Sequence, residues 1–94
     1  MPYHNTNSYS NITTDTTTVV KAGSGVLHTI TFNQPVATEV VTIFDNTAAS
    51  GTTIGTITIP ASPMPVTLTY DVRFITGLTI LTATAASNIT VSFA

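Results

Sequence analysis

Residues 66–72 read Val-Thr-Leu-Thr-Tyr-Asp-Val, an alternation of apolar and polar side chains with a period of two. Successive side chains of a β-strand point to opposite faces of a sheet, so this stretch predicts a strand with one buried face. The four apolar side chains, Tyr70 among them, would line that face, and Thr67, Thr69 and Asp71 would lie on the other.

Further strands are predicted at a spacing of roughly ten residues along the rest of the chain. They cover residues 18–21, 26–32, 39–44, 54–59, 78–82 and 89–93. Segments containing glycine or proline separate all of them except the last two, and no stretch of the chain shows a helical period. We therefore expect an all-β fold: a single β-sandwich, Ig-like or jelly-roll, of about seven short strands, with the strand order left open.

The strand at residues 26–32 contains a histidine. Strict alternation predicts one face made of Val26, His28, Ile30 and Phe32, with Leu27, Thr29 and Thr31 opposite. On that reading His28 shares an apolar face, where it would be packed or lie at a subunit contact.

Residues 1–18 differ from the rest of the chain, because they are rich in Asn, Ser and Thr and contain few bulky side chains. This composition predicts an extended N-terminal arm, followed by a sandwich domain of residues 19–94. The arm could fold along its own domain or lie across a neighbouring subunit. In the second case Tyr3, Tyr9 and Ile12 would anchor it to the partner.

Charge is scarce: charged residues make up 6% of the chain, against about 25% in an ordinary soluble domain. The basic residues are Lys21 and Arg73, too few for the positive surface that nucleic acid binding requires. No apolar run approaches the roughly 20 residues of a membrane span. We expect no nucleic acid or membrane partner. A short chain without cysteine favours stabilisation by oligomerisation or by a larger partner.

Residues that could perform catalysis are few. A Ser-His-Asp arrangement would need His4, in the arm, or His28. Asp45 and Asp71 are the candidate carboxylate pair, but both are expected at strand ends or turns. Asp45 followed by Asn46 is typical of a turn, and a calcium site there would have too few carboxylates. We expect no enzymatic activity, no cofactor and no metal.

Four runs of the sequence resemble small structural proteins of tailed bacteriophages: residues 25–30, residues 43–52, residues 70–74 with 77–80, and residues 89–93. The resemblance spans about residues 21–93 and leaves the arm outside. It is similar to virion decoration (cement) proteins and to modules of head and tail fibres. It implies a β-sandwich that works as an oligomer, often a trimer, and it supplies no active-site residues.

The resemblance leads to an expected function. The chain would bind the outside of the capsid and stabilise contacts between neighbouring major capsid subunits, after synthesis in the bacterial host cytoplasm. The alternative is a fibre, neck or carbohydrate- or receptor-binding module of the virion. A sugar-binding module requires exposed aromatic rings, whereas tryptophan is absent and Tyr70 is expected on a buried strand face.

Overall fold

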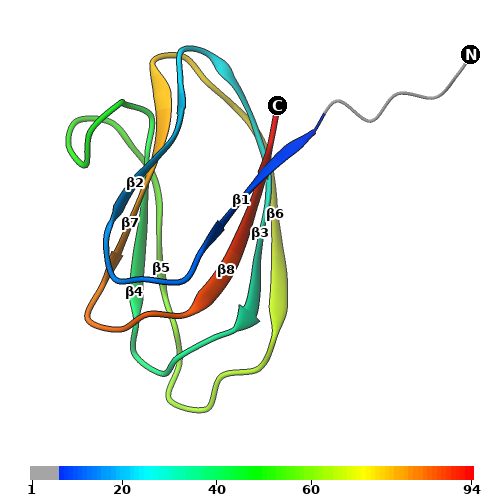
Figure 1. Cartoon of the computed structure of the whole chain (residues 1–94), viewed down its shortest axis with the longest axis vertical. Helices are drawn as coiled ribbons and strands as arrows, with labels where there is room; N and C mark the ends of the chain where they lie inside the picture. The colour runs from blue at the N-terminus through cyan, green and yellow to red at the C-terminus, as the bar shows by residue number, and fades with distance from the viewer. Residues whose placement is uncertain (1–6) are drawn as a thin grey trace, which may run out of the picture.

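The computed structural model describes residues 7–94, which form eight strands and no helix (Figure 1). The all-β prediction is confirmed. The strands are β1 (Ser8–Ile12), β2 (Thr17–Ala22), β3 (Gly25–Gln34), β4 (Val40–Phe44), β5 (Thr53–Thr58), β6 (Val66–Phe74), β7 (Gly77–Ala83) and β8 (Asn88–Phe93).

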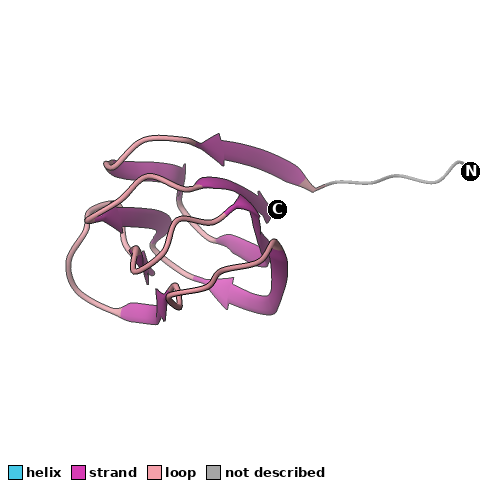
Figure 2. Ribbon diagram, turned by 90° about the horizontal axis from the view of Figure 1, so that it is seen from below, coloured by secondary structure: helices cyan, strands magenta, loops and turns pink. Residues whose placement is uncertain are grey.

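The strands form two antiparallel sheets of four, packed together as a β-sandwich. One sheet has the order β1-β8-β3-β6 and the other β2-β7-β4-β5. Only β4 and β5 are consecutive strands paired in the same sheet, so every other connection crosses between the sheets. Loops join the strands at the two ends of the sandwich (Figure 1), and Figure 2, seen from below, shows strands and loops and no helix in the described residues.

The strand pairs are nested around the β4–β5 hairpin. β3 pairs with β6, β2 with β7, and β1 with β8, each antiparallel. The eight strands therefore form one long antiparallel hairpin that folds around the core, with β4 and β5 at its closed end and β1 and β8 at its open end. This nesting is the jelly-roll arrangement, which decides between the two sandwich types left open by the sequence.

The core lies between the sheets and takes side chains from both inner faces. Alternation is clearest in β8, where Ile89 and Val91 are buried, and in β4, where Val41 and Ile43 are buried. The other buried hydrophobic residues are Ile12, Leu27, Ile30, Phe32, Ile59, Phe74, Leu78 and Ile80. Tyr70 packs against this cluster from β6 and is partly exposed.

The described part of the expected arm belongs to the sandwich. β1 pairs in register with β8 from Ser8↔Phe93 to Ile12↔Ile89, and β2 begins at Thr17. Placing the domain boundary at residue 18 is therefore a prediction that the structure corrects. The signal is weak in sequence because Ile12 is the one aliphatic side chain on the inner side of β1, where serine occupies the other two positions, Ser8 and Ser10.

The predicted faces of residues 26–32 are wrong, because two bulges lie side by side in the sheet. Against β8, Leu27 pairs with Phe93 and Thr29 with Ser92, which leaves His28 as an extra residue. Against β6, the same two residues pair with Val72 and Thr69, so that Tyr70 and Asp71 are both opposite His28. A bulge reverses the alternation beyond it. Leu27 consequently joins the core, and His28 does not.

We predict that Ile12→Ala lowers the free energy of unfolding by about 2–4 kcal/mol, because it removes a side chain that is 4% exposed from the core. Tyr9→Ala in the same strand is the matched control, since Tyr9 is 75% exposed. It should change the unfolding free energy by less than about 0.5 kcal/mol. Urea denaturation of both variants measures the difference. Equal, small effects would show that residues 8–12 do not form part of the folded domain.

Candidate functional site

The two bulges bring His28 and Asp71 together on the outside of the β1-β8-β3-β6 sheet. His28 Nδ1 contacts Asp71 Oδ1, with the two side chains 43% and 56% exposed. Asp71 has a φ of 49°, a left-handed conformation that aspartate tolerates better than most residues do. Ser92 of β8 lies opposite Thr29, the residue after His28, but no hydrogen bond joins Ser92 to His28 within residues 7–94. The His28–Asp71 pair links the two bulged strands, and the described residues show no Ser-His-Asp chain of hydrogen bonds.

Asp45 pins one loop to another instead of pairing with Asp71. Its carboxylate accepts hydrogen bonds from the backbone N–H groups of Ile75 at 3.0 Å, Thr76 at 2.8 Å and Gly77 at 3.4 Å. The bond from Thr76 contributes most to holding the pKa of this carboxyl below its ordinary value of 3.8, followed by the bond from Ile75. Because its oxygens face these N–H donors, Asp45 has the expected structural role in a turn.

The loop after Asp45 is closed by its own asparagine. Asn46 Oδ1 accepts from the Thr47 N–H at 2.8 Å, and Asn46 Nδ2 donates to the Ser50 carbonyl at 2.8 Å. The Asn46 carbonyl accepts from the Thr79 hydroxyl at 2.7 Å, which holds the loop against β7. Residues 45 and 46 are therefore occupied in fixing the loop. Within residues 7–94, no group of three His, Asp or Glu side chains could hold a metal ion.

We predict that Asp45→Asn lowers the melting temperature at pH 7, because a neutral amide is a weaker acceptor for three N–H groups than a carboxylate. The folded-state pKa of Asp45 is lowered, so its contribution is fully present above pH 3.8 and is lost as the pH falls through the folded-state value. Thermal melts from pH 7 to pH 2.5 should show the two proteins converging below about pH 4. A difference that stays constant over this range would contradict the assignment. Asp15→Asn, in the β1–β2 loop, is the control.

Glu39 is the one carboxylate that lies entirely inside the described structure. Its Oε2 accepts from the Ser87 N–H at 3.3 Å, and its Oε1 has no hydrogen-bond partner within residues 7–94. The hydroxyl of Ser87 accepts from the Val36 N–H at 2.8 Å, so the pair ties the β3–β4 and β7–β8 loops together. The sequence contains no signal for this burial, because Glu39 is a charged residue between Thr38 and the apolar residues of β4 that begin at Val40.

The predicted anchor residues fall in different places. Tyr3 lies outside the described residues, and Ile12 is in the core of its own domain, which removes it as a partner contact. Tyr9 is exposed on the outer face of β1. Tyr70 packs on the core and its hydroxyl approaches Gly55 of β5, where an added Cβ would lie 3.1 Å from the oxygen. Burial raises the pKa of Tyr70 above 10.0.

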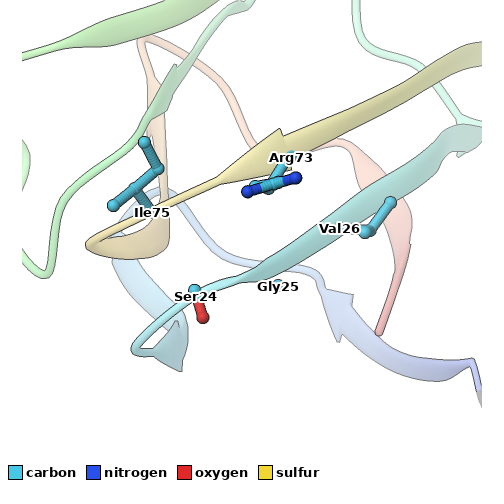
Figure 3. Close-up of a pocket in the computed structure, with 5 residues that line it drawn as sticks. All are labelled: Ser24, Gly25, Val26, Arg73 and Ile75. Atoms are coloured by element: carbon cyan, nitrogen blue, oxygen red, sulfur yellow. The ribbon is translucent and has the colours of Figure 1, made fainter.

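A hollow lies at the end of the sandwich where β3 begins and β6 ends (Figure 3). Ser24, Gly25, Val26, Arg73 and Ile75 line it. Gly25 allows the chain terminus to come close, since an added Cβ would lie 2.2 Å from the Ala94 carbonyl oxygen. The sequence analysis did not identify this site. The available signal was Ile75, an apolar residue in the short connection between β6 and β7.

Exposed aliphatic side chains gather at the two ends of the sandwich. Ile75, 70% exposed, projects from the β6–β7 turn beside Val26, and Val72 is exposed in the same strand as Arg73. At the opposite end Met64, 77% exposed, precedes Val66 in the loop entering β6. Either end offers an apolar surface to a partner protein.

The outer face of the β2-β7-β4-β5 sheet carries no charged side chain in its aligned rows. One row contains Val19, Thr79 and Phe44, of which Thr79 is buried and bonded to the Asn46 carbonyl of the β4–β5 loop, and the next contains Thr17, Leu81, Thr42 and Thr56. Along a strand of a two-layer sheet, core residues alternate with residues that face solvent, and the solvent-facing residues are usually polar with many charges among them. This face is therefore unusually neutral for a surface.

Comparison of the chain with known protein families, with curated proteins and with solved structures finds no match. Residues 7–94 contain no helix that is long and apolar enough to cross a membrane.

Proposed function

We propose that the chain is a non-enzymatic structural protein of a tailed-phage particle, which decorates the capsid and clamps neighbouring major capsid subunits. The runs of sequence within residues 21–93 that resemble phage structural proteins motivate this assignment. The jelly roll is compatible with it, because viral capsid and lectin domains both use this architecture. Fold alone does not imply function, so the assignment rests on the surface.

The observation that carries the proposal is the hollow lined by the exposed aliphatic side chains of Val26 and Ile75 beside Arg73. Exposed aliphatic side chains that border one guanidinium match the composition of interface cores, where charged residues other than arginine are depleted. Arg73 supplies a donor that can bind carbonyl or carboxylate groups of a shell protein in a forked geometry. Binding this end to the shell removes apolar surface from water.

Neutral surfaces support close packing between many copies. A partner that covers the outer face of the β2-β7-β4-β5 sheet would meet threonine, valine and leucine, and no charge would have to be desolvated there. Repetition on a symmetric shell multiplies a weak single contact. A homo-oligomer, a trimer in the proposed case, would use the same faces. Tyr3 remains a proposed contact of the N-terminal segment with a neighbour, whereas Tyr9 lies exposed on the outer face of β1.

The runner-up is a fibre, neck or receptor-binding role in the same kind of particle. All of these share the sandwich, the scarcity of charge and the exposed apolar end, and they differ in the number of copies per particle. The exposed position of Tyr9 favours a binding surface for sugars in addition to shell attachment, because an aromatic ring on an outer sheet face is accessible.

We predict that Ile75→Lys weakens attachment to particles at least tenfold, because it places a second cation beside Arg73 in an apolar contact. Met64→Lys is the matched control at the opposite end, equally exposed, and should attach normally. Particles that lack the chain are incubated with each purified protein, pelleted and quantified, and melting temperatures confirm folding. Equal attachment of Ile75→Lys and the unmodified protein would refute the assigned contact.

A further inference from the structure

The outer face of the β1-β8-β3-β6 sheet is paved with hydroxyl and carboxamide groups. Register aligns one row across all four strands as Tyr9, Ser92, Thr29 and Thr69, and the next row as Asn11, Thr90, Thr31 and Thr67. Every side chain in both rows can donate and accept hydrogen bonds, and none of the eight carries a charge. The rows form a grid spaced about 4.8 Å between strands and about 6.7 Å along them.

Hydrogen bonds between side chains hold part of this grid in place. Asn88 Oδ1 accepts from Asn11 Nδ2 at 2.8 Å and from Asn33 Nδ2 at 3.2 Å, which links β1, β8 and β3. Asn33 Nδ2 also donates to the Thr90 hydroxyl at 2.9 Å, and Asn11 Nδ2 donates to the Ile89 carbonyl. None of these bonds uses the Oδ1 atoms of Asn11 and Asn33 or the Nδ2 of Asn88. Those atoms are fixed in position, so a ligand that uses them loses little side-chain entropy on binding.

Tyr9 adds an aromatic ring at the β1 edge of the same face. The ring is 75% exposed, and its strand neighbour is Ser92. Tyrosine offers a rigid ring surface with a polar hydroxyl and only two side-chain torsions to order. The C–H groups on one face of a sugar ring pack against such a surface, while the sugar hydroxyls remain free to bond to neighbouring polar groups.

We propose that this face binds a neutral polysaccharide chain, with Tyr9 stacking on one sugar ring and the Asn and Thr side chains bonding to sugar hydroxyls. Charge selects this ligand class. The two rows contain no cation to pair with phosphate, sulfate or uronate groups. The ionisable residues of the same sheet are Asp71 and Arg73 in the edge strand β6, the strand farthest from Tyr9, and His28 of β3, which pairs with Asp71.

A protein partner fits this face less well than a sugar chain does. Both rows lack aliphatic side chains, whereas interface cores are rich in apolar and aromatic groups. The exposed aliphatic residues lie instead toward the two ends of the sandwich and, for Val19, on the outer face of the other sheet. Polysaccharide binding at this face is independent of the shell attachment assigned to Ile75, so either can fail without the other.

The test is affinity electrophoresis of the full chain in native gels, where a net charge of −2 drives migration. The gels contain a mannan, a β-glucan or a galactan as neutral polymers, or polygalacturonate as an anionic polymer. We expect retardation by at least one neutral polymer and none by polygalacturonate. Tyr9→Ala should lower the affinity about tenfold, whereas Tyr9→Phe, which keeps the ring, should lose less than threefold.

Ile75→Ala is the matched control, because this residue is as exposed as Tyr9 but lies outside the face. It should bind like the unmodified protein, and a melting curve for each variant shows whether the fold is retained. Absence of retardation in all three neutral gels would overturn the proposal. So would equal retardation of Tyr9→Ala, or stronger retardation by the anionic polymer than by the neutral ones.

Discussion

The antiparallel pairing of β1 with β8 is the contact on which the rest of this structure depends. It joins the first and last strands of the long antiparallel hairpin and completes the sheet that carries the outer hydroxyl face. The same pairing turns Ile12 into the core and Tyr9 to the outside. Strand pairs this far apart in sequence must close long loops before they gain stability, so a jelly roll is expected to fold slowly compared with a helical domain of its size.

Alternation in the sequence predicted the strands correctly where the inner face is apolar, as at Ile89, Val91 and Phe93 in residues 89–93 and at Val41 and Ile43 in residues 39–44. It failed for β1, because serine occupies two of its three inner-side positions and a short polar strand has the composition of a disordered arm. It also assigned the wrong faces to β3. The two bulges at His28 and Asp71 depend on how three strands meet, and a single strand's sequence contains no such information. Nested pairing is likewise a property of the whole chain.

Candidate residues were predicted correctly where their role depends on neighbouring residues in the chain, and not where it depends on segments that are distant in the sequence. The turn role of Asp45 follows from a local pattern of residue types and is confirmed, although its hydrogen-bond donors come from a distant turn. The buried position of Glu39 and the hollow beside Arg73 arise from segments that meet only in the folded chain. Sequence reasoning detected the scarcity of charge, and the structure shows where the few charges lie: in loops, in the core and on the edge strands β2 and β6.

Scarce charge connects the fold to the proposed function. A free protein with neutral faces is poorly protected against association, and a protein whose surface is covered by neighbours does not need that protection.

The most direct measurement is the number of copies of this chain in purified particles from its source culture, by quantitative mass spectrometry with labelled peptides. A decoration protein should be about as abundant as the major capsid protein. A handful of copies would assign it to the neck, tail or fibres, and complete absence would contradict a role in the particle.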